Sequence, residues 1–211
     1  MVDASLLEAW LSGRSLARGL PPPTADRGAW RVDTRSTSET ARWVFAAPSP
    51  AVRELADSLV GPGLLIKLCD GVEVLRAALP ERWTMHAPGY FMVAGEAPPE
   101  RALPEGYRLR TLVAGPVTTV EILAETGELA ASGHAAEAAS AFVYDRIVTT
   151  PGHRRKGLGG VVMQALRATR RDETVPQLLV ATEEGRALYS SLGWTVLSDY
   201  STGSILPSPE R

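Results

Sequence analysis

The segment from residue 141 to residue 171 constrains the fold of this chain more than any other part of its sequence. Residues 141–149 are rich in β-branched and aromatic side chains and are predicted to form a strand, which Pro151 and Gly152 end. A helix is expected over residues 158–171, because apolar side chains recur there on one side. The turn between them reads His153-Arg154-Arg155-Lys156-Gly157-Leu158-Gly159-Gly160. A basic, glycine-containing turn therefore starts a helix directly after a strand.

Such a turn is a site for an anion such as a pyrophosphate. The first amides of a helix have no partner within the helix and lie at the positive end of its dipole. Gly157 and Gly159 let the backbone approach a ligand without an intervening Cβ atom, and Arg154, Arg155 and Lys156 add positive charge. The alternative interpretation is a basic turn that only starts a solvent-exposed helix.

Two other glycine motifs do not fit this turn. A phosphate-binding P-loop needs Gly-Lys followed by Ser or Thr, whereas Lys156 precedes Gly157 here. A dinucleotide fingerprint that begins at Gly157 needs a third glycine where Val162 stands. Both nucleotide-binding folds are thereby disfavoured.

Composition restricts the class of protein. The 211 residues are 45% hydrophobic and 22% charged, as in a globular chain of one domain or two small ones. The net charge of -2 gives no general attraction to nucleic acid or to an anionic membrane. Cys69 is the single cysteine and is expected to be an inert strand residue. No histidine or carboxylate spacing indicates a metal. Without an apolar stretch of ~20 residues or a secretion signal, a cytoplasmic location is expected.

Periodicity and turn residues divide the chain at about residue 104, after a proline-rich linker at 95–100. In region 1–104 we expect helices at 4–20, 50–60 and 72–79, and strands at 29–33, 41–47, 64–69 and 90–94. In region 105–211 we expect strands at 107–113, 117–124, 128–133, 141–149, 178–181 and 195–199, with a further one at 204–206, and helices at 158–171 and 185–192. Short turns between the first four of these strands indicate an antiparallel meander.

The two regions share a local pattern. Residues 64–67 and 178–181 are apolar strands, each followed by a helix, a helix stop and a Trp-Thr pair, at Trp83-Thr84 and at Trp194-Thr195. One interpretation is that the first region is a degenerate half-copy of the second. The other is a chance match of short apolar patterns. Different strand orders in the two halves would exclude the first.

Two segments in region 105–211 resemble motifs of the GNAT N-acetyltransferase superfamily. Residues 145–159 contain Arg154, Gly157 and Gly159 at the spacing of its acyl-CoA-binding signature, Arg/Gln-x-x-Gly-x-Gly/Ala. Residues 185–194 are similar to its later helix, Leu-Tyr-x-x-x-Gly-Phe. The resemblance implies an α/β (α+β) GNAT fold, with a mixed, mostly antiparallel sheet flanked by helices. The accessory region 1–104 adds a smaller α/β part.

The resemblance also implies site residues and acetyl-CoA as co-substrate. Tyr189 matches the tyrosine that protonates the departing thiolate, although it could instead be a core aromatic. An amide near Val148 would stabilise the oxyanion. The implied cofactor-binding residues are Ile147, Val148 and Thr149 along the pantetheine, and Arg154, Arg155, Lys156, Gly157, Leu158, Gly159 and Gly160 around the pyrophosphate.

The chain also departs from the family pattern. Thr182 stands where many members have an asparagine, Gly185 where an alanine is usual, and Trp194 where a phenylalanine is common. Only residues 114–116 separate the first two strands of the second region, so the two helices that usually lie between them are missing. We therefore expect the N-terminal region to cover the acceptor side of the sheet.

No motif selects the general base. Asp145 is closest in sequence to the cofactor strand and is the first candidate, with Glu121, His134 and His86 as others, while His153 is expected to be a solvated loop residue. The predicted reaction is direct attack by a primary amine on acetyl-CoA in a ternary complex. A small-molecule acceptor is favoured over a protein, and a homodimer is left open. The alternatives are an acyl-CoA-binding regulatory or inactive GNAT-like protein, and an interaction module whose N-terminal half docks another chain.

Overall fold

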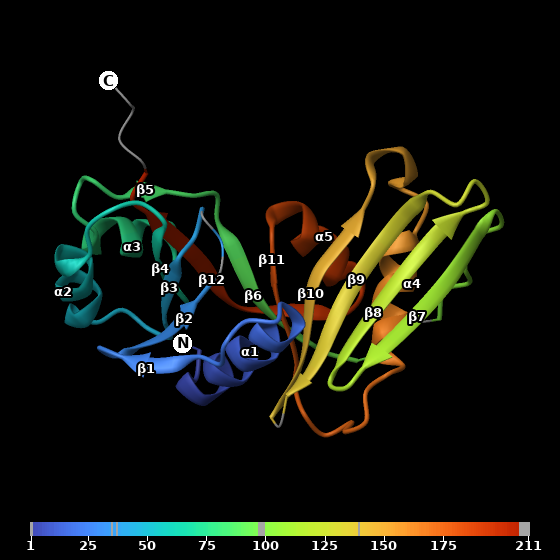
Figure 1. The fold of residues 1–211 in the computed structure, drawn as a ribbon, viewed down its shortest axis with the longest axis horizontal. Helices are drawn as coiled ribbons and strands as arrows, with labels where there is room; N and C mark the ends of the chain where they lie inside the picture. The colour runs from blue at the N-terminus through green and yellow to red at the C-terminus, as the bar shows by residue number, and fades with distance from the viewer. Residues whose placement is uncertain (1, 35, 37, 97–99, 139, 207–211) are drawn as a thin grey trace.

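The computed structural model describes residues 2–34, 36, 38–96, 100–138 and 140–206. Within them, twelve strands form one sheet in the order β1-β2-β3-β4-β12-β6-β11-β10-β9-β8-β7, with β5 paired to β12 (Figure 1). The N-terminal elements are α1 (Ala4–Ala17), β1 (Thr24–Asp26), β2 (Ala29–Asp33), β3 (Ala41–Phe45), α2 (Pro50–Ser58), β4 (Leu64–Leu68), α3 (Val72–Ala78), β5 (Thr84–Met85) and β6 (Gly89–Ala94). The C-terminal elements are β7 (Tyr107–Ala114), β8 (Val117–Ala124), β9 (Leu129–Ala138), β10 (Ala141–Thr149), the 3₁₀ turn η1 (Pro151–His153), α4 (Leu158–Arg167), β11 (Gln177–Ala181), α5 (Glu183–Ser191) and β12 (Trp194–Ser204).

The predicted class and most predicted elements are confirmed. Two strand pairs, β3–β4 and β10–β11, are parallel, and the other pairings are antiparallel. The helix predicted over 158–171 is too long: α4 ends at Arg167, and the turn that follows is tightened by the bonds Thr169 N to Leu166 O and Arg170 N to Arg167 O. The sequence also missed the short strands β1 and β5.

The last strand was also predicted wrongly. Residues 195–199 and 204–206 were expected as separate strands, but β12 is continuous from Trp194 to Ser204. Its first part pairs with β6 and its last part with β4. β6, from the first region, lies between β11 and β12 of the second. Strands from the two sides of residue 104 therefore alternate in one sheet. A division into two domains at that residue remains a proposal.

Helices cover both faces of the sheet. The apolar side chains of α2 and α3 pack on the same cluster as Ile66 and Leu68, and those of α4 and α5 pack on Phe142 and Tyr144. On the opposite face, α1 packs through Trp10 against Phe91 of β6 and Tyr200 of β12. Figure 1 shows α1 lying across the middle of the sheet. No helix in the described part of the chain is long and apolar enough to cross a membrane.

The hairpin β7–β8 confirms that the two expected helices are missing, because Gly115 and Pro116 alone join its strands. On the face opposite α4, α1 occupies part of the space by packing on β9 and β10, and the close approach of Gly13 to Val143 permits this contact. N-terminal residues thus cover part of this face, and its identity as the acceptor side stays a prediction.

Candidate functional site

The strand that precedes α4 leaves its neighbour partway along. β10 and β11 are paired at two rows only, Phe142–Gln177 and Val143–Leu178. On its other side, β10 shifts register against β9 between Asp145 and Val148, and Arg146 within this shift has a φ of 52°. An extra residue of this kind is a β-bulge, which bends its strand. The bulge therefore coincides with the point at which β10 separates from β11.

The three residues expected along the pantetheine lie on this separated stretch. Ile147 packs against the core beneath α4. Val148 pairs with Ser132 of β9, and its side chain is 53% exposed. Thr149 ends the strand. The opened side of β10 thus offers backbone groups and one exposed apolar side chain to a ligand that enters between β10 and β11.

The glycine-containing turn starts α4, as predicted. Gly157 is the residue before the helix and has a φ of 78°, a conformation that favours glycine. Gly159 lies against α5, because a Cβ atom built on it would be 3.0 Å from Leu188 Cδ2. Leu158 is buried in the core. The amides of Leu158 and Gly159 have no backbone partner among the described residues, whereas Gly160 N donates to Gly157 O over 3.0 Å. Gly159 lies near Thr149 at the end of β10, since a Cβ atom on it would be 3.8 Å from Thr149 Oγ1.

The basic side chains of the turn differ in their contacts. Arg154 Nε donates to the carbonyl of Thr149 over 3.4 Å, and Arg155 is exposed with a φ of 63°. Lys156 Nζ donates to Tyr107 Oη over 3.0 Å. His153 was expected to be solvated, but its side chain is 14% exposed and its Nδ1 lies 2.8 Å from Tyr107 Oη. This prediction was wrong because Tyr107 of β7 reaches under the turn.

Sequence reasoning missed Arg101, which adds another cation to the turn. A Cβ atom built on Gly160 would lie 3.0 Å from Arg101 Cδ, and one on Gly157 would lie 4.0 Å from Arg101 Nη1. The backbone amide of Arg101 donates to Gln164 Oε1 over 2.8 Å. Residue 101 directly follows the predicted linker, so no periodic pattern linked it to α4.

Tyr189 is on α5, directly after Leu188, which lies against Gly159 at the start of α4. It is 8% exposed and belongs to the core cluster that contains Tyr144 and Trp194. Burial raises the pKa of Tyr189, and the negative charge of Asp145 acts in the same direction. Its hydroxyl has no hydrogen-bond partner among the described residues, whereas Tyr144 Oη donates to Gln177 Oε1 over 2.6 Å. Tyr189 is a protonated phenol whose donor is free for a ligand.

Asp145 faces α1 and is surrounded by guanidinium groups. Arg18 binds it through two hydrogen bonds, Nε to Oδ2 at 2.6 Å and Nη2 to Oδ1 at 2.9 Å. Arg146 Nε lies 3.3 Å from Oδ2 and Arg14 Nε lies 3.7 Å from Oδ1. These contacts occupy the carboxylate and fix the end of α1 to β10. In this geometry the carboxylate of Asp145, the first candidate base, anchors α1 to β10.

The other candidate bases are in different surroundings. Glu121 is paired with Arg110 of the neighbouring strand. His86 contacts Ser204 Oγ over 2.7 Å in the N-terminal half. His134 lies opposite Asp145 on β9, and its Nδ1 is 3.0 Å from Thr119 Oγ1. Burial lowers the pKa of His134, as does the charge of Arg146 to a lesser degree. A neutral imidazole at pH 7 therefore lies on the face of the exposed Val148 side chain.

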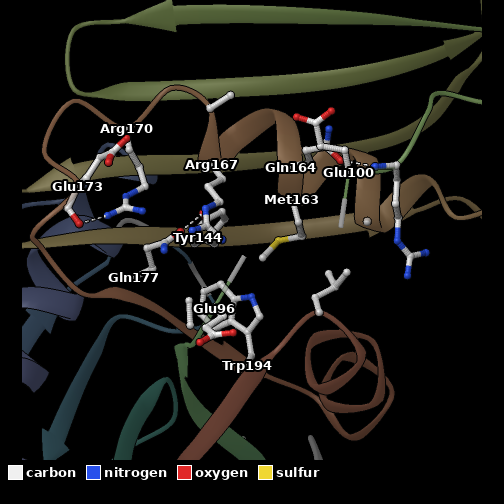
Figure 2. Close-up of a pocket in the computed structure, with 15 residues that line it drawn as sticks. Glu96, Glu100, Tyr144, Met163, Gln164, Arg167, Arg170, Glu173, Gln177 and Trp194 are labelled. Carbon is white, nitrogen blue, oxygen red and sulfur yellow. Dashed lines mark hydrogen bonds between the residues drawn. The ribbon is translucent and has the colours of Figure 1, made fainter. Parts of the chain in front are cut away.

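A cavity of about 400 Å³ lies beside α4 (Figure 2). Tyr144, Met163 and Trp194 form its apolar floor, and Arg167 and Arg170 are among the charged groups at its rim. It extends from Gly160 at the start of α4 to the end of that helix, and it reaches Gln177 at the first row of β11. Its far end is therefore remote from the separated ends of β10 and β11, and it is not the predicted pantetheine groove.

Comparison with known proteins identifies the fold. No family model matches the sequence, and no curated protein matches it significantly. A GCN5-related N-acetyltransferase from Kribbella flavida is structurally similar, with a TM-score of 0.67 at 14% identity over 99% of this chain and 97% of that one. One from Sphaerobacter thermophilus gives 0.61 at 15% identity over 87% and 79%.

A third similar structure is described as a tandem GNAT protein from the clavulanic acid biosynthesis pathway. It has a TM-score of 0.56 at 16% identity, over 85% of this chain and 79% of that one. At these identities the similarity shows the fold. The chain has the GNAT fold, as the two sequence motifs implied, and the match to the Kribbella protein includes the N-terminal region.

Proposed function

We propose that this protein is an N-acetyltransferase that transfers the acetyl group of acetyl-CoA to a primary amine of a small molecule. The observation that supports this proposal is that the glycine turn of α4 lies between the free end of β10 and α5. A Cβ atom on Gly159 would be 3.8 Å from Thr149 Oγ1 and 3.0 Å from Leu188 Cδ2, and Leu188 precedes Tyr189. The pantetheine would lie between the separated ends of β10 and β11. The pyrophosphate would accept hydrogen bonds from the first amides of α4 and lie near Arg101, Arg154 and Arg155.

The proposed reaction is direct transfer. The amine nitrogen attacks the thioester carbon, and a backbone amide near Val148 stabilises the oxyanion. The C–S bond then breaks, and the thiolate takes a proton from the Tyr189 hydroxyl. The nitrogen, an ammonium group at pH 7, loses one proton to a base before it attacks and a second proton as the amide forms. A buried tyrosine with a raised pKa stays protonated at neutral pH, as this step requires.

We infer that His134, in place of Asp145, is the base. Asp145 is occupied by Arg18, whereas His134 is neutral at pH 7 and uses only its Nδ1 in a contact within the described residues. It lies two residues from Ser132, the partner of Val148. Because the pKa of His134 is lowered from the ordinary value near 6.5, kcat at saturating amine should rise with pH below about 6.5 and level off above it.

The test is release of free coenzyme A thiol from acetyl-CoA with a panel of primary amines between pH 5 and pH 9, together with calorimetric binding of acetyl-CoA. Amine-dependent release supports the proposal. The engagement of Asp145 by arginines favours a second function, an acyl-CoA-binding protein without turnover. Binding without release on any amine would support that function, and absence of binding would contradict both.

A further inference from the structure

A second cavity lies in the N-terminal half, on the face that carries α1. Its volume is about 610 Å³, within the range of small-molecule sites. Glu39, Lys67, His86, Thr202 and Ser204 contribute its polar groups. β3 and β4 remain paired at all five rows beside it, so it is not a second copy of the groove at β10.

Lys67 is the central cation of this cavity. Its ammonium donates to Thr202 Oγ1 over 3.1 Å and lies 5.7 Å from the centre of the Tyr200 ring. Burial lowers the pKa of Lys67 to about 8, and the nearby charge of Glu39 acts in the opposite direction. Lys67 is therefore still mostly protonated at pH 7, but it is held where water compensates its charge poorly.

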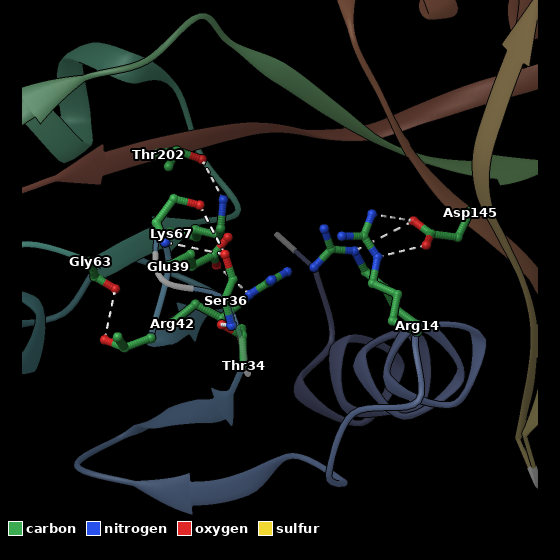
Figure 3. Close-up of polar contacts among 12 residues, drawn as sticks. Arg14, Thr34, Ser36, Glu39, Arg42, Gly63, Lys67, Asp145 and Thr202 are labelled. Atoms are coloured by element: carbon green, nitrogen blue, oxygen red, sulfur yellow. Dashed lines mark hydrogen bonds and ion pairs between the residues drawn. The ribbon is translucent and has the colours of Figure 1, made fainter.

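The charges around the cavity do not balance. Arg42 is 3% exposed, and its Nε lies 2.6 Å from Glu39 Oε1. Its Nη1 is buried without a hydrogen-bond partner among the described residues. Glu39 thus faces two cations, Arg42 and Lys67. Arg14 of α1 stands with Asp145 on the other side of the view in Figure 3. Arg18, the residue after α1, also pairs with Asp145. Lys67 and Arg42 against Glu39 leave one positive charge in surplus at the cavity, which a further negative charge beside Lys67 would balance. Arg14 and Arg18 against Asp145 leave another beside it.

The cavity and the proposed transfer site lie at the same end of the sheet. β12 runs parallel to β10, since two antiparallel pairings and one parallel pairing connect them. The strands between them stop short, because β11 ends at Ala181 and β6 begins at Gly89, opposite Tyr200. Lys67 pairs with Thr202, beyond that row. Three strand spacings of about 4.8 Å separate β10 from β12, whose Thr202 contacts the Lys67 ammonium. Because β10 has separated from β11 at this end, the two sites are at least roughly 14 Å apart.

We propose that this cavity binds the carboxylate of the acceptor through Lys67, and that the acceptor is an amino carboxylic acid whose amine and carboxylate are separated by a chain of several carbons. The inference rests on the proposed acetyl transfer for the role of the amine. A singly charged carboxylate fits the surplus of one positive charge. A phosphate dianion beside Glu39 would exceed it.

The test uses ω-amino acids of increasing length, from glycine through 4-aminobutyrate and 6-aminohexanoate to 8-aminooctanoate, each compared with the n-alkylamine of equal chain length. Binding to the full chain is measured by calorimetry without acetyl-CoA, and thiol release is measured with it. The variants are Lys67→Met, Lys67→Arg and, as a charge-removal control on the other face, Arg53→Met, an exposed residue of α2.

Lys67→Met should weaken binding of 8-aminooctanoate at least ~10-fold, as expected for a charge-assisted contact, while Lys67→Arg and Arg53→Met retain it. The alkylamines should be unaffected, and the longer acids should exceed glycine. Equal binding by Lys67→Met and the wild type would overturn the inference, as would tighter binding of phosphoethanolamine than of any ω-amino acid. Lys67-dependent binding without thiol release would support the carboxylate site and contradict the acetyl transfer. If thiol release is equally fast with the amino acids and the alkylamines, and is unchanged in Lys67→Met, the result would support acetyl transfer and contradict the carboxylate site.

Discussion

The two halves of the sheet have the same arrangement of strands. In the N-terminal half β2, β3 and β4 are followed by β12, and in the C-terminal half β9, β10 and β11 are followed by β6. The central pair of each half is parallel and joined through a helix, α2 or α4, and the outer pairs are antiparallel. Each half also takes its last strand from the other. The repeat predicted from the Trp-Thr pattern thus passes the test of strand order.

The halves differ where a ligand would enter. β3 and β4 pair along their full length and α2 begins at Pro50 after Ser49, whereas β10 bends at Arg146 and α4 begins after Gly157. Cys69, which follows β4, is buried, and burial raises its pKa to about 12, in agreement with the inert residue predicted. Strand order alone therefore does not create the proposed cofactor groove. In the C-terminal half, β10 and β11 also stop pairing, and the first amides of α4 lie beside the unpaired ends.

Deletion of Arg146 should make the C-terminal half like the N-terminal one. Removing the bulge residue restores regular alternation, because Asp145 and Val148 share one face and Ile147 lies on the other. β10 could then continue to pair with β11, and we expect acetyl-CoA binding to fall below detection by calorimetry. Arg146→Gly, which tolerates the φ of 52°, is the control and should retain binding. Unchanged binding by the deletion variant would separate the groove from the bulge.

Tyr189→Phe should distinguish a catalytic phenol from a core aromatic. We expect kcat to fall about 100-fold, the lower range for loss of a general acid, with acetyl-CoA affinity nearly unchanged. Tyr144→Phe is the matched control, because Tyr144 lies in the same core but donates to Gln177. Steady-state rates and calorimetry measure the two quantities. Equal rates for the two variants would assign Tyr189 to packing.

Gly157→Ala should weaken acetyl-CoA binding about tenfold. Alanine is strained at the φ of 78° that Gly157 adopts, and relief of that strain would displace the amides of the first turn of α4. Gly61→Ala, in the loop after α2, is the control in the N-terminal half, because Gly61 also has a positive φ, of 92°, and nothing lies within 4 Å of the added carbon. Both variants should lose similar stability in thermal unfolding, and only the first should lose affinity. A similar loss of affinity in both would mean that the turn at α4 has no special role.

Local sequence patterns predicted most of the fold and about half of the candidate site. Apolar periodicity located the helices and most strands, and the motifs around Gly157 and Tyr189 located the proposed donor side. The sequence did not predict the last part of β12, because Ser201, Thr202 and Ser204 are polar although they are buried between neighbouring strands. The sequence did not predict the bulge in β10, because the residue with the positive φ is Arg146, and an arginine does not indicate such a backbone conformation.

The acceptor side could not be predicted because its contacts are distant in sequence. The carboxylate of Asp145 meets Arg18 across 127 residues, and Lys67 meets Thr202 across 135. No local pattern records such pairs. Asp145 was chosen for its nearness in sequence to the cofactor strand, and that criterion could not reveal that three arginines surround it.

Lys67→Met tests the energetic side of the same comparison, because Leu178 and Val180, the residues of β11 on the α1 face, are apolar where β4 has Lys67. The folded protein disfavours the charged form of Lys67, whose pKa is about 8 against 10.5 ordinarily. The wild type therefore loses stability below pH 8, and this loss fades as pH rises from 8 to 10.5. Below pH 8 the variant should be more stable by on the order of 1 kcal/mol, or about 2–4 °C in Tm, with the difference shrinking toward pH 10.5. Thermal unfolding at pH 7 and pH 10 measures it, with Arg53→Met as control. A variant less stable than the wild type at pH 7 would show that Lys67 serves folding, and not a ligand at the expense of stability.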